Sequence, residues 1–299
     1  MKLAAIDIGS NAARLLITDV IETKKNKPEF IKSSLVRVPL RLGFDVFDKG
    51  EISDIKARHL VSTIKAYRNL LDAYEVQHLK ACATSAMRDA KNGEAIIRQV
   101  KEETGIQIDI ISGDKEAGLI YENHAADSLT KDSAYLYIDV GGGSTEVTLF
   151  NNSNMLFKRS FNIGTIRLLK QQVTEEQWGE MKSYIRNEVK NLKKVTGIGT
   201  GGNINKVFTL SKRKEGRPLP LDLLKDFYKE FSSLSLAERM SLYKLREDRA
   251  DVIVPALLIY INVLKWAGAN EILIPKIGLA DGLVRSLYQE IKSTASDKK

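Results

Sequence analysis

The chain has 299 residues, 43% hydrophobic and 28% charged, which is the balance of a globular protein long enough for two domains. It lacks both a run of ~20 apolar residues and the apolar core of a signal peptide, and its one cysteine, Cys82, excludes an internal disulfide, so we expect a cytoplasmic protein with no membrane contact. The net charge of +8 is compatible with nucleic acid, an anionic membrane or a soluble polyanion as partner, or with solubility alone.

Strand patterns and amphipathic helices alternate in the first half of the chain. Strands are predicted on both sides of a small-residue loop within 5–17, and at 29–40, 79–84 and 106–111. Helices are predicted from Ser53 to about residue 74, over 92–103 with Gly105 ending the helix, and from Ser112 to about Ala126. This order predicts a mixed α/β fold.

The second half contains the same kinds of element with more helix. Strands are predicted at 134–140, 146–150, 155–162, 196–199 and 272–274. Helices are predicted within 172–194, over 221–231, 236–242 and 248–267, and within 278–291.

The two halves repeat one sequence pattern. Residues 5–17 read AIDIGSNAARLLI and residues 137–149 read YIDVGGGSTEVTL, and Asp7 and Asp139 are 132 residues apart. In both segments an apolar strand ends in an acid, passes through a loop of small residues and continues as a second strand. The repeat predicts two similar domains.

Four glycine-containing loops follow predicted strands. Backbone N–H groups in such loops can approach a phosphate, and hydroxyl and amide side chains add donors, although any single loop is more simply a tight turn. The loops contain Ser10 and Asn11; Gly141, Gly142, Gly143, Ser144 and Thr145; Gly201, Gly202 and Asn203; and Gly278 to Gly282. Four of them at strand ends favour phosphate binding, and none has the P-loop or dinucleotide-binding spacing.

Acidic residues adjoin these loops. Asp7 and Asp139 end apolar strands and Glu146 follows the second loop, which suits a Mg²⁺ site, whereas an isolated acid would more simply cap a loop. Glu116 lies in the first turn of a predicted helix, where stabilisation by the helix dipole is a sufficient explanation. Arg88 and Arg167 each suit a phosphate contact or a solvated helix start.

Taken together, these motifs resemble the exopolyphosphatase/guanosine pentaphosphatase family. The motifs that carry the resemblance are DIGSN at 7–11, ISGxxEA at 111–117, IDVGGGSTE at 138–146, GTGGN at 199–203, RxDRADVIVPALLI at 246–259 and GLADGL at 278–283. The resemblance implies two ribonuclease-H-like domains of the actin-like ATPase superfamily, with mixed sheets and helices, around an interdomain cleft. We expect domains at 1–121 and 122–283, with a terminal helix at 284–299 that packs back on the first, and no carboxyl-terminal HD-type domain.

The resemblance also implies roles for individual residues. Glu116 becomes the catalytic base, Asp139 and Glu146 would hold Mg²⁺ and the attacking water, and Gly141, Gly142, Ser144, Asn11 and Arg88 would contact phosphate. The implied reaction is in-line attack of water on the terminal phosphoryl group of inorganic polyphosphate. A guanosine pentaphosphate 5′-phosphohydrolase, or a non-catalytic sensor of phosphate or nucleotide with the same fold, is the alternative.

The chain departs from the family pattern at three places, which leaves substrate preference open. Gly118 stands where arginine is common, Asn203 replaces threonine, and Ala280-Asp281 replaces arginine and glutamate. A homodimer agrees with the resemblance, and a nucleic-acid partner is not expected.

Overall fold

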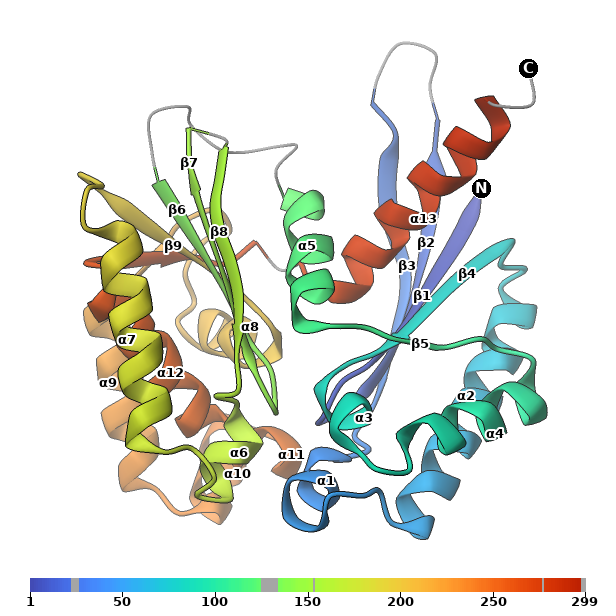
Figure 1. The fold of residues 1–299 in the computed structure, drawn as a ribbon, viewed down its shortest axis with the longest axis horizontal. Helices are drawn as coiled ribbons and strands as arrows, with labels where there is room; N and C mark the ends of the chain where they lie inside the picture. The colour runs from blue at the N-terminus through green and yellow to red at the C-terminus, as the bar shows by residue number, and fades with distance from the viewer. Residues whose placement is uncertain (23–26, 125–133, 153, 276, 297–299) are drawn as a thin grey trace. The chain divides into compact units, whose positions relative to one another are not determined.

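The computed structural model describes residues 1–22, 27–124, 134–152, 154–275 and 277–296. The chain divides into two compact units (Figure 1): unit 1 consists of Met1–Asn123 and Gly278–Lys299, and unit 2 of His124–Ile277. Among the described residues, no helix has the length and apolar character needed to cross a membrane.

Unit 1 contains a five-stranded mixed sheet in the order β3-β2-β1-β4-β5. Its strands are β1 (Lys2–Ile8), β2 (Ala13–Ile21), β3 (Glu29–Val38), β4 (His78–Ala83) and β5 (Asp109–Ile110). Its helices are α1 (Gly43–Lys49), α2 (Asp54–Ala73), α3 (Ser85–Asp89), α4 (Gly93–Thr104), α5 (Gly113–His124) and α13 (Leu279–Ser296). The central strand β1 is antiparallel to β2 and parallel to β4.

The carboxyl-terminal helix α13 packs on the sheet of unit 1, against β1, β2 and β4 (Figure 1). Leu283 of α13 shares one buried cluster with Leu3 and Leu16 of the sheet and with Leu119 of α5. This cluster therefore fixes α5, and the acidic residues of its first turn, to the sheet through apolar burial.

Unit 2 contains a six-stranded sheet in the order β10-β11-β9-β6-β7-β8. Its strands are β6 (Ala134–Val140), β7 (Thr145–Asn151), β8 (Asn154–Phe161), β9 (Val195–Thr200), β10 (Leu219–Pro220) and β11 (Glu271–Leu273). Its helices are α6 (Thr165–Leu169), α7 (Glu175–Val189), α8 (Gly202–Leu210), α9 (Leu221–Ser233), α10 (Leu236–Tyr243), α11 (Glu247–Ala250) and α12 (Ile253–Trp266).

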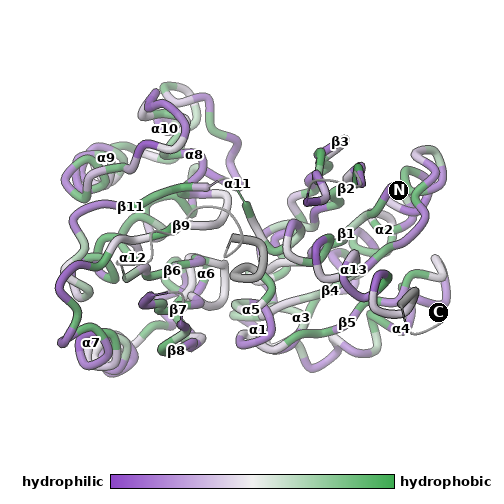
Figure 2. Tube along the Cα trace, turned by 90° about the horizontal axis from the view of Figure 1, so that it is seen from above, coloured by the Kyte–Doolittle hydropathy of each residue, from purple (hydrophilic) through white to green (hydrophobic). Residues whose placement is uncertain are grey.

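Helix α12 forms the centre of the core of unit 2. It packs against α6, α7, α8, α9 and β6, and Ile259, Tyr260 and Val263 are among its fully buried residues. Hydrophilic and hydrophobic residues both occur along α7 (Figure 2), as expected for a helix with one buried stripe.

The predicted internal repeat is confirmed by the topology. The order strand–strand–strand–helix–helix–strand occurs as β1-β2-β3-α1-α2-β4 and again as β6-β7-β8-α6-α7-β9. The loops after β1 and β6 close with equivalent hydrogen bonds, from Gly9 N to Ala12 O (3.0 Å) and from Gly141 N to Ser144 O (2.9 Å). Two mixed sheets with flanking helices are the expected fold class.

Several element boundaries differ from the sequence prediction. The strand expected at 106–111 is reduced to Asp109–Ile110, because Ile106 and Ile108 are buried outside the sheet ladder. The helix expected at 248–267 is divided into α11 and α12, and the short helices α1, α3, α6 and α8 were not predicted. The expected end of α5 near Ala126 lies outside the described residues.

Ser53 precedes α2 as predicted, but it does not cap the helix. Its hydroxyl donates to Asp45 Oδ2 at 2.5 Å instead of accepting from a backbone N–H of the first turn. Asp45 also accepts from Lys56 Nζ at 2.6 Å, so the start of α2 is attached to α1 by a polar network.

Gly282 marks the closest approach of α13 to α5, since a Cβ added there would lie 2.1 Å from the Leu119 carbonyl oxygen. We expect Gly282→Ala to lower the free energy of unfolding by about 1–3 kcal/mol, because the helices would have to separate. The control is Gly179→Ala in α7, where no atom lies within 4 Å of the added Cβ and a gain of about 0.5–1 kcal/mol is expected. Urea unfolding measures both, and equal stability of the two variants would contradict the prediction.

Candidate functional site

Asp7 is buried near the end of β1 and forms an ion pair across the sheet. It is opposite Arg14 of β2 in the strand register, and Arg14 Nη1 donates to Asp7 Oδ2 at 2.6 Å. Asp7 Oδ1 is buried and has no hydrogen-bond partner within the described part of the chain. The sequence prediction treated Asp7 as a metal ligand and missed Arg14, which already neutralises its charge.

The loop after β1 is held from two sides. The buried Ser10 hydroxyl lies 2.8 Å from the Ser85 hydroxyl of α3, and the Ser10 carbonyl accepts from Gly43 N at 2.8 Å. The Asn11 carbonyl accepts from Arg41 N at 3.0 Å, and Arg41 has a φ of 53°, which is rare for a side chain of its size. Arg41 and Ser85 therefore join the predicted Ser10 and Asn11 as residues of this loop region.

Glu116 lies in the first turn of α5 and is 9% exposed. Ser112 begins this helix, because its hydroxyl accepts from Lys115 N at 3.2 Å. Burial raises the pKa of the Cys82 thiol well above its ordinary value, and the nearby charges of Asp7 and Glu116 raise it further. Glu116 and Asp7 thus act on the same buried region of unit 1.

Arg88 holds the chain segment that leads into α5. Its Nη1 donates to the Ile111 carbonyl at 2.8 Å, one residue before Ser112. This contact gives Arg88 a structural role, and its partial exposure leaves the predicted phosphate contact compatible with the geometry.

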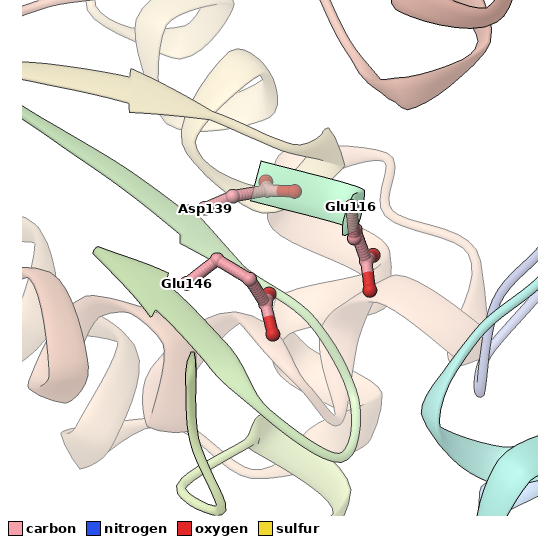
Figure 3. A group of neighbouring side chains, drawn as sticks. All are labelled: Glu116, Asp139 and Glu146. Carbon is pink, nitrogen blue, oxygen red and sulfur yellow. The ribbon is translucent and has the colours of Figure 1, made fainter. Parts of the chain in front are cut away.

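Asp139 and Glu146 form a pair of neighbouring carboxylates in unit 2. They are opposite one another on β6 and β7, so both side chains leave the same face of the sheet (Figure 3). A carboxylate oxygen of each lies within 4.8 Å of the other. Glu146 Oε1 accepts from the hydroxyls of Ser144 (2.6 Å) and Ser160 (2.7 Å), which fixes the carboxylate in place.

The acid pair affects a buried tyrosine. Tyr260 of α12 donates its hydroxyl to the Thr200 carbonyl. Burial raises the pKa of Tyr260 well above its ordinary value of 10.0, and the charges of Asp139 and Glu146 raise it further. Two carboxylates held side by side repel one another, and a bound divalent cation relieves that repulsion. Oxygen donors in this arrangement fit a divalent metal.

The loop 141–145 is closed by the start of α6. Gly142 O accepts from Ile166 N at 2.8 Å, and the Arg167 guanidinium donates to Gly143 O at 2.8 Å. The buried Thr145 hydroxyl donates to the Ile163 carbonyl at 2.5 Å. Arg167, for which a phosphate contact was one interpretation, therefore supports the loop through its backbone.

The third glycine loop passes close to the acid pair. Gly201 has a φ of 100°, and a Cβ on it would lie 3.0 Å from Asp139 Oδ1. Helix α8 begins at Gly202, and a Cβ there would lie 2.4 Å from Arg249 Nη1. Arg249 donates to Asn203 Oδ1 at 3.0 Å, so the departure at Asn203 supplies an acceptor for an arginine that the sequence prediction did not include.

The departure at Asp281 has a structural explanation. Its Oδ2 accepts from Gly278 N at 2.9 Å and its Oδ1 pairs with Lys32 at 2.6 Å, so Asp281 begins α13 and ties it to β3. The predicted fourth glycine loop is thus the start of a helix in unit 1.

Comparison with known proteins identifies related sequences. A model of the Ppx/GppA phosphatase family matches residues 20–291. The bifunctional 3-dehydroquinate synthase/phosphatase of Fusobacterium nucleatum is 29% identical over 97% of this chain, which spans only 46% of that protein's length. Exopolyphosphatase 1 of Mycobacterium tuberculosis is 26% identical over 99% of this chain and 91% of its own length.

A solved structure has the same fold. The crystal structure of an exopolyphosphatase from Cytophaga hutchinsonii matches 97% of this chain and 98% of its own, with a TM-score of 0.82 and 25% identity.

The raised pKa of Tyr260 predicts a pH dependence of stability. Because the unfolded phenol ionises near pH 10 and the folded one only at higher pH, the stability due to this group is complete below pH 10 and is lost as the pH rises above it. We expect Tyr260→Phe to cost about 1–2 kcal/mol at pH 7 through the lost hydrogen bond, with a smaller difference from the parent above pH 10. Urea unfolding at pH 7, 9 and 10.5 measures this, and a difference independent of pH would refute it.

Proposed function

The chain belongs to the Ppx/GppA phosphatase family, and on that basis we propose that it hydrolyses the terminal phosphate of inorganic polyphosphate. The family match covers the ISGxxEA, IDVGGGSTE and GTGGN motifs and confirms the resemblance that they carry. The observation that carries the proposal is the carboxylate pair of Asp139 and Glu146, fixed by two serine hydroxyls next to two glycine loops.

We propose roles for the predicted residues of each unit. Glu116 is the general base, and Ser10, Asn11 and Arg88 contact phosphate from unit 1. The unit 2 contacts come from Ser144, Thr145 and the glycines 141–143, 201 and 202. Support comes from the loops themselves, since glycine permits close approach of backbone N–H groups to an anion.

The proposed reaction is a displacement at phosphorus. The water oxygen bonds to the terminal phosphorus while the bond from that phosphorus to the bridging oxygen breaks, which releases orthophosphate and a polymer one phosphate shorter. Glu116 accepts the proton from the water, from its place in the first turn of α5. The departing bridging oxygen carries the negative charge that the loop donors stabilise.

We propose Mg²⁺ as the metal, held by Asp139 and Glu146. Hard oxygen ligands and few protein carboxylates are what Mg²⁺ prefers. When bound, it would reduce the charge on the phosphate chain and polarise the terminal phosphoryl group. The sequence predicts Asp7 as a further metal ligand; Arg14 pairs with its Oδ2, and its Oδ1 has no hydrogen-bond partner within the described part of the chain. A reducing cytoplasmic location agrees with the buried thiol of Cys82.

A substrate panel tests the proposed function. Phosphate release is measured from polyphosphates of several lengths, guanosine pentaphosphate and ATP, each with Mg²⁺ and with a chelator. We expect release from polyphosphate with Mg²⁺ and its loss with the chelator. Faster release from guanosine pentaphosphate would assign the nucleotide as substrate instead, and no release from any compound would favour the non-catalytic sensor.

Glu116→Gln tests the base. We expect kcat to fall by about 10²–10⁴-fold, because the variant lacks the group that accepts the water's proton. The matched control is Asp114→Asn, which removes an equal charge from the first turn of the same helix at an exposed position. Similar kcat values for the two variants would reduce Glu116 to a helix-stabilising acid.

A further inference from the structure

A strongly basic segment follows helix α8 and has no part in the proposed catalytic site. Residues 212–217 read KRKEGR, with four cations against one acid, and every one of them is exposed. The segment joins α8 to the short strand β10. Its charge is therefore available to a ligand in solution.

The basic segment has a defined conformation. Lys212 and Gly216 have φ values of 55° and 78°, and Arg217 N donates to Lys214 O at 3.1 Å, which closes a tight turn. Arg213 Nη1 donates to the Pro218 carbonyl at 3.2 Å, which fixes the end of the segment. The cations are thus presented on an ordered turn, which lowers the entropy cost of binding.

Helix α8 connects this turn to the glycine loop beside the acid pair. The helix starts at Gly202, next to Gly201 and Asp139, and its nine residues span about 13 Å before the basic segment begins. Lys206 lies four residues after Gly202 and three after Asn203, so it shares their face of the helix, and the basic segment begins just after the helix ends at Leu210. One cation therefore lies on that face of α8, between the glycine loop and the basic segment.

A simpler explanation accounts for part of this pattern. Cations near the carboxyl end of a helix interact favourably with its dipole, by about 0.3–1 kcal/mol each. That explanation covers the last turn of a helix, but not Lys206 in the middle of α8 or Arg217 beyond the closed turn. A row of cations that leads away from a phosphate-binding loop fits a polyanion longer than the part that reacts.

We infer that Lys206 and the basic segment 212–217 form a distal subsite for the internal phosphates of a long polyphosphate chain. The inference rests on the proposed function, and it assigns to this subsite a preference for long over short chains. Each contact from the basic segment is an exposed ion pair between a cation and a phosphate oxygen, so the subsite acts through charge and is weakened by salt.

The test compares two variants with equal loss of charge. Lys212→Gln, Lys214→Gln and Arg217→Gln are combined in one protein, with Arg213 retained for its bond to Pro218. The control combines Lys182→Gln, Lys190→Gln and Lys193→Gln, which are exposed positions on and after α7, before the start of β9. The strand β9 separates these positions from the glycine loop at its other end.

KM is measured for a long-chain polyphosphate and for tripolyphosphate at low and physiological salt. We expect the ratio of the long-chain KM to the tripolyphosphate KM to rise about tenfold in the first variant and to stay at the parent value in the control. The ratio in the parent should also rise with salt more steeply than in the first variant. Equal ratios in the two variants would overturn the subsite.

Direct binding separates this inference from the proposed function. If the parent releases no phosphate from either polymer, the proposed function fails, and binding of labelled long-chain polyphosphate to the parent and both variants still decides the subsite. Weaker binding by the first variant alone supports it. Single-stranded RNA of equal charge is the competitor, and displacement of polyphosphate by RNA at equal concentration would make the segment a nucleic-acid surface and overturn the assignment.

Discussion

The electrostatics of each unit depend on how a carboxylate near the end of its central strand is compensated. An uncompensated buried carboxylate costs several kcal/mol. Asp7 is buried and Asp139 is half-buried, so each unit must supply charge or hydrogen-bond donors to its acid. Asp7 and Asp139 have equivalent positions in the repeated topology, and the residue opposite each across the antiparallel pair differs. Arg14 opposite Asp7 gives a neutral pair, whereas Glu146 opposite Asp139 adds a second negative charge.

This one difference separates the chemistry of the two copies. In unit 2, hydroxyls of Ser144 and Ser160 satisfy one oxygen of Glu146, but hydroxyl donors do not neutralise two carboxylates. A cation is the natural complement, and the close approach of Gly201 to Asp139 keeps the backbone near that charge without a side chain in the way. The positive φ of Gly201 is what makes this approach possible, because a Cβ there would lie at 3.0 Å from a carboxylate oxygen.

The sequence predicted the features that depend on local pattern, and missed those that depend on contacts distant along the chain. The repeat, the strands with Asp7 and Asp139 near their ends, and the loop glycines were all visible, because period-two apolar patterns and small residues are local signals. The pairing of Arg14 with Asp7 could also have been predicted from the sequence. Arg14 follows Asp7 by seven residues, as Glu146 follows Asp139, and a tight hairpin places each of them opposite the acid. The contact of Arg249 with Asn203 could not be predicted from a local pattern, because the two residues are 46 positions apart in the sequence. Glu116 could not be separated from an ordinary helix-stabilising acid without the family resemblance, because both uses need the same position on the helix.

The same backbone arrangement therefore occurs in both units with different charges beside the turn after the central strand. A tight turn after the central strand, closed from Gly9 to Ala12 in one unit and from Gly141 to Ser144 in the other, presents backbone groups in both copies. In unit 1 the Asp7–Arg14 pair offsets the negative charge beside that turn, and the Arg41 backbone N–H donates to the Asn11 carbonyl within it, so an anion is not repelled there by Asp7. In unit 2 the paired carboxylates suit a cation. On the proposed function the substrate is a polyanion that reacts with its counterion bound. The strand register keeps one residue opposite the acid in each unit, arginine in unit 1 and glutamate in unit 2, so this position sets the charge beside each turn.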